Sequence, residues 1–546
     1  METAPGQYAY YTQRNDMVTF AGGLPAAAMR PNGFGVTFVY DSFNGRLAIV
    51  RDTSGRELEL SYDSVGHLQS IADPAQGSVT YGFKAPPLDV NGQNADNLSF
   101  TTLDTVTYQD QASRRYLVSD WDYLGATAWS LATRIQGVID ELGVAYETVV
   151  YDSYGRATSS ELAGGVDRFQ VSAGGVTDPI GTSRTYQYST SSGAITAIYQ
   201  PAGAGCPASN STSAFDANDN LTSINDVNGK RICYANDLTR NLETSRVEGL
   251  AGGTNCPTVT GSGATLPAGS RKISSQWHPD WRLQAKVAEP GRITTYVYNG
   301  QPDPFAGGAA ASCAPAGALL PDGKPIAVLC RQVEQATTDA NGAAGFSATL
   351  DGTVANREQR WSYNQWGQVL THDGPRTDIA DITTYTYYSD TSFTGTGAAA
   401  VGHTTGDLQS VSNAAGQLTQ YTQYDKHGNV IQSIDPNGVV TTNSYDLRQR
   451  LLSTSVGGQT TSYSYDLAGQ LKRVTRPDAS WIGYDYDPAH RQTAVYDNLG
   501  NRIEYLLDNA GNRIGENVKD SAGSLRRQLA RSIDALGRVQ QTTGRN

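Results

Sequence analysis

The chain has 546 residues, 38% of them hydrophobic and 17% charged, with 58 glycines and 31 tyrosines but only 3 methionines. This composition favours many short strands and turns over helices. The net charge of −12, with no run of Lys or Arg, argues against nucleic acid and anionic membrane surfaces as partners, because both require a basic footprint.

The chain shows no signal for membrane insertion or export. No stretch approaches the roughly 18 consecutive apolar residues of a membrane span, and the opening segment Met1–Gln7 has neither the basic nor the apolar region of a signal peptide. Strand-like sequence begins almost at once at Tyr8, and one strand's worth of residues follows the last turn at 534–537. We therefore expect a fragment of a larger polypeptide, secreted or delivered by a route that this chain does not encode.

A Tyr-Asp pair recurs along the chain. Near the C-terminus its copies follow at intervals of 20 or 21 residues, at Tyr424-Asp425, Tyr445-Asp446, Tyr465-Asp466, Tyr486-Asp487 and Leu507-Asp508. Earlier copies stand at Tyr40-Asp41, Tyr62-Asp63 and Tyr151-Asp152. Self-similarity at a fixed period indicates an array of like units, so we expect one architecture throughout.

Each Tyr-Asp pair is predicted to begin a tight turn. Asp stands where a type I turn favours a side-chain acceptor, and a glycine follows it where positive φ is easy. These glycines are Gly45, Gly66, Gly155, Gly428, Gly469 and Gly511. Similar turns begin halfway between the pairs, at Asp52, Asp435 and Asp497, so each repeat is predicted to be two strands and two turns. We assign Tyr, Asp and Gly to the scaffold and not to catalysis.

The segments between turns alternate as half-buried antiparallel strands do. In 57–62, Leu58, Leu60 and Tyr62 share one face. The strand entering a turn often ends in two aromatic residues on the same side, as at Tyr186/Tyr188, Tyr296/Tyr298, Trp361/Tyr363, Tyr385/Tyr387, Tyr463/Tyr465 and Tyr484/Tyr486. Edge-to-face contact is worth about 0.5–1.5 kcal/mol beyond burial, so stacked tyrosines are predicted to staple one repeat to the next.

We expect a single repeat body over residues 1–546. Residues 1–90 hold regular repeats, 91–200 degenerate repeats, 201–355 degenerate repeats with long loops and all 5 cysteines, and 356–546 the most regular repeats. Residues 127–142 show a helix-like pattern but end in the turn frame, and are predicted as strand. Residues 300–327 are predicted to be a long surface excursion.

The fold depends on what covers the apolar face of the strands. No convincing amphipathic helix supplies a second layer, so the sheet must cover itself. A sandwich, a propeller and a wall that winds round and closes all use the same alternation, and local pattern does not choose among them. The residues therefore predict an all-β protein of antiparallel strands, without deciding its architecture.

The recurring unit Tyr-Asp-x-x-Gly-Arg/Asn-Leu/Ile resembles the YD repeats of the Rhs family. It is seen in Tyr40-Asp41 with Gly45-Arg46-Leu47, in Tyr62-Asp63 with Gly66-His67-Leu68, and in Asp508 with Gly511-Asn512-Arg513-Ile514. The resemblance implies strands that wind into a large curved sheet or hollow β-cage, with inner-face tyrosines lining the wall. In polymorphic toxins and Tc toxin subunits of this family, the cage holds a C-terminal toxin domain until delivery.

The chain departs from the family pattern at its end. Family cores commonly close with an Asp-Pro-x-Gly-Leu cleavage site before the toxin, and nothing after Asp534 matches that region. The related segments at 73–77 and 435–438 sit in ordinary repeat turns and lack the Leu, so no protease residues are transferred. If the chain is a fragment, its cage is open or incomplete and its cargo is absent.

No residue pattern points to catalysis, a metal ion or a cofactor, and we expect none of the three. The histidines are scattered without ligand spacing; they are His67, His278, His372, His403, His427 and His490. Carboxylate pairs such as Asp485/Asp487 or Asp216/Asp219 are arbitrary choices among many turn aspartates.

The cysteines contain no Cys-x-x-Cys and no nearby paired histidines for zinc. Pairs such as Cys206 with Cys233, or Cys313 with Cys330, are candidates for disulfides if the protein lives outside the cytoplasm. The alternative is that these residues and Cys256 are small buried side chains.

The leading hypothesis is a non-catalytic shell segment of a bacterial Rhs-type toxin or effector, enclosing a C-terminal cargo domain absent from this chain. Its partners are then that toxin cargo domain and a secretion adaptor, with no nucleic acid. The alternative is a secreted or cell-surface adhesion module whose exposed aromatics bind carbohydrate. A hydrolase embedded in the repeats is a third hypothesis, which would need paired carboxylates in a cleft.

Overall fold

The computed structural model describes residues 2–4, 7–84, 102–118, 134–203 and 207–545. Within them, 44 strands form one sheet. We divide it into a first coil (2–203), a connecting arc (207–350) and a second coil (357–545).

The first coil holds β1 (Glu2–Ala4), β2 (Gln7–Tyr11), β3 (Met17–Ala21), β4 (Leu24–Met29), β5 (Gly35–Tyr40), β6 (Leu47–Asp52), β7 (Glu57–Tyr62), β8 (Leu68–Ala72), β9 (Ser78–Lys84), β10 (Thr102–Thr107), β11 (Ser113–Val118), β12 (Ile135–Ile139), β13 (Ala145–Tyr151), β14 (Ala157–Leu162), β15 (Val166–Ser172), β16 (Gly175–Thr177), β17 (Ser183–Tyr188) and β18 (Ile195–Gln200). The connecting arc holds β19 (Ser209–Phe215), β20 (Leu221–Asn225), β21 (Lys230–Asp237), β22 (Leu242–Ala251), α1 (Cys256–Thr260), β23 (Arg271–Trp277), β24 (Gln284–Glu289), β25 (Arg292–Tyr298), β26 (Leu329–Ala336) and η4 (Gly345–Ser347). The second coil holds β27 (Arg357–Tyr363), β28 (Val369–Asp373), β29 (Thr383–Tyr387), β30 (Ser392–Thr394), η5 (Gly397–Ala399), β31 (Val401–His403), β32 (Leu408–Ser412), β33 (Leu418–Tyr424), β34 (Val430–Ile434), β35 (Val440–Tyr445), β36 (Leu451–Val456), β37 (Gln459–Tyr465), β38 (Leu471–Thr475), β39 (Trp481–Tyr486), β40 (Gln492–Asp497), β41 (Arg502–Leu507), β42 (Arg513–Lys519), β43 (Leu525–Ile533) and β44 (Val539–Arg545).

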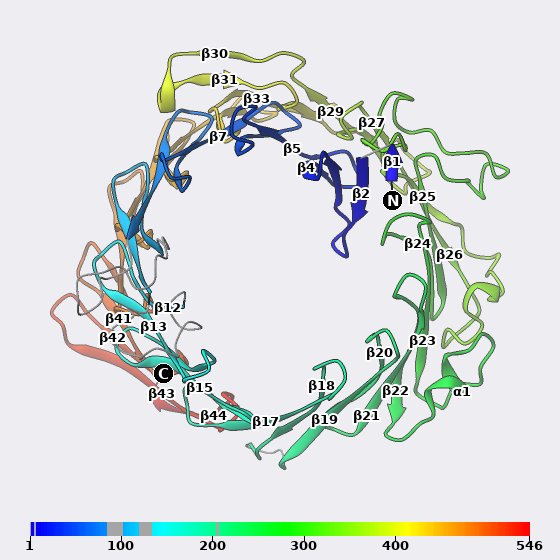
Figure 1. Ribbon diagram of the computed structural model, residues 1–546, viewed down its shortest axis with the longest axis horizontal. Helices are drawn as coiled ribbons and strands as arrows, with labels where there is room; N and C mark the ends of the chain where they lie inside the picture. The colour runs from blue at the N-terminus through cyan, green and yellow to red at the C-terminus, as the bar shows by residue number, and fades with distance from the viewer. Residues whose placement is uncertain (1, 5–6, 85–101, 119–133, 204–206, 546) are drawn as a thin grey trace.

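The sheet curves into a ring around an open centre (Figure 1). Each strand pairs antiparallel with the next, except that β29 pairs with β32 and leaves the β30/β31 hairpin as an outward insertion. The first coil passes round the upper, left and lower sides of Figure 1, the arc forms the right side, and the second coil runs over the upper and left sides again. The predicted all-β fold of antiparallel strands winding into a large curved sheet is confirmed.

The wall is a single layer. The helical elements of the described residues are α1 and short 3-10 turns, and none is long and apolar enough to cross a membrane. Most strand residues are therefore half-buried, with no second sheet to cover them. The winding wall, and neither the sandwich nor the propeller, is the architecture that the alternating pattern left open.

The aromatic side of this wall faces the interior of the ring. Helix α1 lies outside the ring (Figure 1), and its Cys256 is disulfide-bonded to Cys233 of β21, so Cys233 points outward. Residues directly opposite each other in paired strands share a face, which carries the outward face from Cys233 to Val247 and then to Lys272.

The same pairings, followed strand by strand in both directions, assign the aromatic pairs to the opposite, inward face; these include Tyr186/Tyr188, Tyr296/Tyr298, Trp361/Tyr363, Tyr385/Tyr387, Tyr463/Tyr465 and Tyr484/Tyr486. The outward face includes hydroxyl pairs such as Ser444 and Ser453, whose oxygens lie 2.7 Å apart, and it also carries Trp481 and Tyr496.

The tyrosine that precedes each turn aspartate binds the preceding repeat. The Tyr62 hydroxyl donates to the Leu47 carbonyl (2.8 Å), and the Tyr465 hydroxyl donates to the Leu451 carbonyl (3.0 Å). The same bond joins Tyr40 to Pro25, Tyr151 to Ile135, Tyr424 to Leu408, Tyr445 to Val430 and Tyr486 to Leu471. The predicted staple is thus a hydrogen bond to the backbone more than a stack of rings.

An arginine completes this contact in several repeats. The Arg46 guanidinium lies 5.4 Å from the Tyr62 ring centre, and Arg450 lies 5.0 Å from that of Tyr465. Arg46 also lies over Gly66, where an added Cβ would stand 2.2 Å from its Nη2. The turn glycine therefore serves both positive φ and the close approach of this arginine.

The prediction of a surface excursion at 300–327 is wrong in one respect. The segment between β25 and β26 forms only isolated bridges, but its Leu320 and Ile326 are buried against Met17 of β3 and Trp281. The N-terminal strands leave an apolar outward side, and this loop covers it. A second and smaller apolar cluster lies between α1 and strands β21 and β22.

Two disulfides are present among the described residues. Cys313–Cys330 is confirmed, whereas the pairing of Cys206 with Cys233 is wrong, because Cys233 bonds Cys256 where α1 packs on the outward face of β21 and β22. Cys206 lies outside the described residues, as does 127–133 of the segment predicted as strand; β12 confirms that prediction for 135–139. The division into four stretches stays a prediction.

We expect Tyr465→Phe to lower the free energy of unfolding by about 1 kcal/mol, because it leaves the Leu451 carbonyl without its donor. The matched control is Tyr463→Phe, on the same face of the same strand, whose hydroxyl has no hydrogen-bond partner within the described part of the chain. Urea unfolding measures both variants. Equal effects would show that the tyrosines act by packing alone.

Candidate functional site: the seam between the coils

The turn aspartates lie at the edges of the wall and organise their own turns. The Asp63 carboxylate accepts the amides of Val65 and His67, and the arrangement recurs at Asp152, Asp425, Asp446, Asp487 and Asp508. At Asp466 the amide of Gln470 is bound, and at Asp41 those of Phe43 and Asn44. The turns at Asp446 and Asp487 have no glycine, so Gln449 (φ 66°) and His490 (φ 61°) take the left-handed position.

Turns of the second coil rest on turns of the first. We call this line of contact the seam and define it by the pairs Arg56–Asp407, Asp73–His427, Asp110–Arg448, Glu141–Arg448, Asp140–His490 and Thr182–Ala535. Three of these contacts join residues 351, 350 and 353 positions apart. One turn of the coil therefore takes about 350 residues of chain.

The seam has a consistent polarity of charge. The first coil contributes the carboxylates of Asp73, Asp110, Asp140 and Glu141, and the second coil contributes the cations of Arg448 and, when protonated, His427 and His490. Only the Arg56–Asp407 pair among the ion pairs of the seam is reversed. Because opposite charges meet along the line, the seam holds one register of the two coils.

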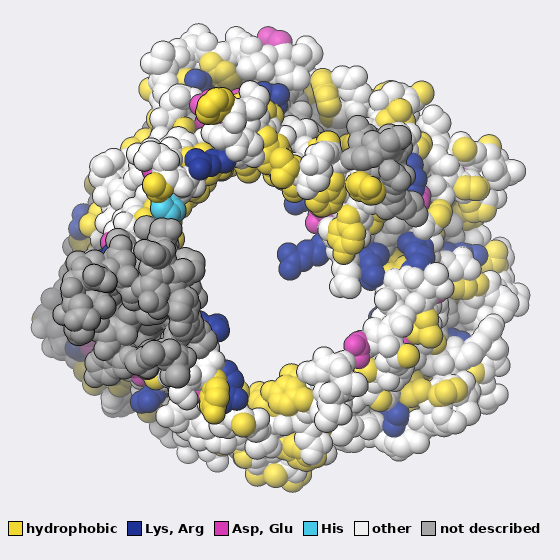
Figure 2. All heavy atoms as spheres, viewed as in Figure 1, with side chains coloured by type: hydrophobic (Ala, Val, Ile, Leu, Met, Phe, Trp, Pro, Cys, Tyr) yellow, Lys and Arg dark blue, Asp and Glu magenta, His cyan; other side chains and the backbone are white. Residues whose placement is uncertain are grey.

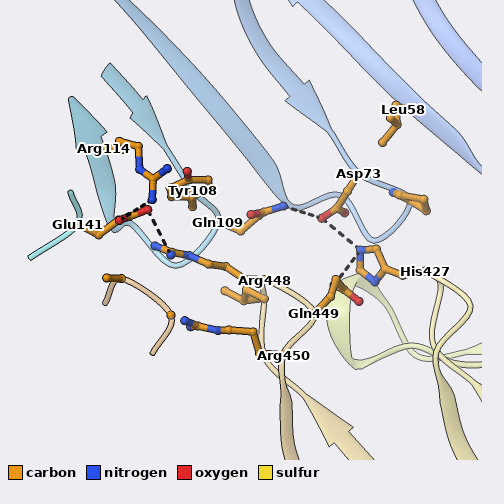
Figure 3. Close-up of a pocket in the computed structure, with 14 residues that line it drawn as sticks. Leu58, Asp73, Tyr108, Gln109, Arg114, Glu141, His427, Arg448, Gln449 and Arg450 are labelled. Carbon is orange, nitrogen blue, oxygen red and sulfur yellow. Dashed lines mark hydrogen bonds and ion pairs between the residues drawn. The ribbon is translucent and has the colours of Figure 1, made fainter. Parts of the chain in front are cut away.

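A cavity of about 520 Å³ lies on the seam (Figure 3). Glu141, whose side chain is 2% exposed, pairs with Arg114 (3.2 Å) of its own coil and with Arg448 (3.8 Å) of the other. Arg448 also pairs with Asp110 (2.9 Å), and its guanidinium lies 4.2 Å from the Tyr108 ring centre. Arg448 thus joins three first-coil residues across the seam.

His427 occupies the other end of this cavity (Figure 3). Its Nε2 lies 3.2 Å from Asp73 Oδ2 across the seam and 3.3 Å from Gln449 Nε2, and its Nδ1 lies 3.8 Å from Asp425 Oδ2. The neighbouring Asp425 carboxylate raises the pKa of His427, and Asp73 adds to this against the opposing effect of burial. Asp73 is further held by Gln109 (3.2 Å).

His490 makes a second contact of the same kind. Its Nε2 lies 2.7 Å from Asp140 Oδ2, and its ring stacks on Tyr146 of the first coil with centres 4.3 Å apart. The Asp140 side chain is fully buried. The sequence alone gave neither histidine a function, because their partners lie about 350 residues away and only the pitch of the coil brings them together.

The carboxylate pairs considered from the sequence are not brought together across a cleft. Asp485 faces outward and pairs with Arg502 (2.8 Å), while Asp487 holds its own turn and Arg491. Asp216 is bound by Asn220 within its turn. His278 is buried and accepts the amide of Asp280. Across the described ranges, His, Cys, Asp and Glu form no cluster of three that could hold a metal ion.

Comparison with known proteins agrees with this architecture. Residues 403–440, 424–457 and 445–480 match the RHS Repeat family. Residues 403–480 therefore carry RHS repeats, and the fold of the whole described chain is shell-like. Over 98% of its length it is similar to the crystal structure of TcdB2-TccC3, with a TM-score of 0.54, 13% identity and 31% of that chain covered.

Two further proteins are similar to this chain. The crystal structure of TcdB2-TccC3 without the hypervariable C-terminal region has a TM-score of 0.54 and 12% identity, over 98% of this chain and 33% of that one. A stretch of 120 residues, 22% of the chain, is 32% identical to double-stranded DNA deaminase toxin A of Burkholderia cenocepacia (strain H111). That stretch spans 8% of the length of the toxin.

We expect Arg448→Ala to lower the free energy of unfolding by about 3 kcal/mol, since it removes the cross-seam partner of a buried carboxylate. Arg156→Ala is the matched control, because Arg156 pairs with Asp152 of its own turn and its side chain is 70% exposed. That solvent-exposed pair is expected to contribute little to the free energy of unfolding. Similar losses in the two variants, followed by urea unfolding, would contradict a seam held by buried charge.

Proposed function

We propose that this chain is a wall segment of a toxin shell that encloses a cargo domain outside this chain and keeps it inactive until delivery. The single observation that carries the proposal is the ring around an open centre with its aromatic face turned inward (Figure 1). A compact protein would bury that face against a second layer. The inward aromatic face is large and is not covered by a second layer, so it is suited to contact a partner held inside the ring.

The inner surface has the chemistry to hold a polypeptide. Phe169 and Val171 on β15 and Tyr188 on β17 share the inward face and are 37%, 44% and 52% exposed. Figure 2 shows hydrophobic side chains and Lys and Arg side chains together around the opening. Exposed apolar surface of this kind marks a site of interaction, and apolar, amide and charged groups of a cargo chain all find partners on it.

In this proposal the chain is not the enzyme. Tyr, Asp and Gly of the repeat turns hold the wall, the toxic activity belongs to the cargo, and a secretion adaptor delivers the assembly out of the bacterium. The stretch of 120 residues that is 32% identical to a double-stranded DNA deaminase toxin supports this assignment. The adhesion alternative would gain from paired aromatics that face outward, whereas the strand pairings assign them to the inward face.

Limited proteolysis of the protein expressed from its native gene, with all flanking sequence, tests the proposal. The segment that follows the repeats is expected to be cut at least about tenfold more slowly in the whole protein than when produced alone, because the open form must be populated before cleavage. Equal rates of cleavage, followed by mass spectrometry, would refute enclosure. Full toxic activity of the intact protein would also refute it.

A further inference from the structure

Two of the contacts across the seam are made by histidines. His427 of the turn after β33 meets Asp73 of the turn after β8, and His490 of the turn after β39 meets Asp140 of the turn after β12. In both, a first-coil carboxylate that is at most 14% exposed faces a second-coil imidazole that is at most 19% exposed. Histidine is the one side chain that ordinarily changes charge between about pH 5 and 8.

We propose that these two pairs form a pH-dependent contact between the coils. The contact is strong while the imidazoles are protonated and weakens once they lose the proton. The inference concerns the seam itself and does not depend on whether the ring encloses a cargo.

The carboxylates that His427 faces favour its charged form. His427 faces the carboxylates of Asp73 across the seam and Asp425 on its own turn, whereas the Gln449 amide nitrogen from the turn after β35 is a donor and opposes the charged form. The cations of the same cavity are already committed to other carboxylates: Arg448 to Asp110 and Glu141, Arg450 to Asp446, and Arg114 to Glu141.

His490 faces Asp140 and the Tyr146 ring from the first coil. The Asp487 carboxylate of its own turn is taken by Arg491 (2.8 Å). A neutral imidazole keeps a hydrogen bond to Asp140 but loses the ion pair with a buried carboxylate, and that pair is stronger where water is excluded.

The direction of the pH effect follows from His427. Its pKa is raised in the folded protein, so its contribution is fully present below the ordinary histidine pKa of about 6.5 and is lost as pH rises through the folded-state value. The histidine contacts across the seam are therefore expected to be strongest in mildly acidic solution and to weaken above neutrality. The arginine pairs do not titrate in this range, so the coils loosen locally and do not fall apart.

Amide hydrogen exchange of the purified chain tests whether the contact between the coils depends on pH. The seam turns 424–429 and 487–491 are compared with the turn at 435–439, which no seam pair includes, so that the intrinsic pH dependence of exchange cancels. Between about pH 6 and pH 8.5 we expect the protection of the seam turns, relative to that turn, to fall at least about threefold. An unchanged ratio would overturn the proposal.

Variants assign the effect to the two histidines. In the double variant His427→Gln with His490→Gln the ratio is expected to be independent of pH, whereas His372→Gln, whose ring contacts Gln359 and Trp361 within its own coil, should behave as wild type. If the histidine variant does not fold, Asp73→Asn with Asp140→Asn removes the same pairs from the other side. Retention of the wild-type pH response in a folded variant of either kind would contradict the assignment.

Discussion

A one-layer wall has no opposing layer to pack against, so its stability depends on the contacts between each repeat and the one before it. The main such contact is a hydrogen bond from the tyrosine that precedes the turn aspartate. Its hydroxyl donates to a backbone carbonyl about 15 residues earlier, as from Tyr62 to Leu47. The ring lies on the inward face, its hydroxyl satisfies a carbonyl at the start of a strand, and the arginine of the earlier turn covers it. One residue type thus accounts for the inward aromatic face and for the cohesion of the sheet.

The contact between coils is of another kind. Turn tips are solvated and polar, so two rows of turns do not bury an apolar interface, and they meet instead through charge. Carboxylates on the first coil and Arg448, His427 and His490 on the second hold the register that strand pairing cannot hold. Hydrogen bonds hold the wall along the chain, whereas the contact between the two coils depends on ion pairs and is therefore sensitive to salt.

Much of the fold follows from local pattern. Alternation in 57–62 and the turn chemistry of Asp63 and Gly66 predict hairpins correctly, because both depend on neighbours within a few residues. The partner of Cys233, the burial of Ile326 and the meeting of His490 with Asp140 were missed, because each depends on how far the sheet curves over hundreds of residues. Curvature comes from twist and bulges summed over the strands, which no single repeat reveals.

The measurement that tests the central claim most directly is small-angle X-ray scattering of the purified chain. A ring with an open centre predicts a radius of gyration well above about 24 Å, the value for a compact body of this length, and a distance distribution that peaks beyond the wall thickness. A radius near that compact value, with the distribution of a solid globule, would contradict a hollow wall with its aromatic face turned inward.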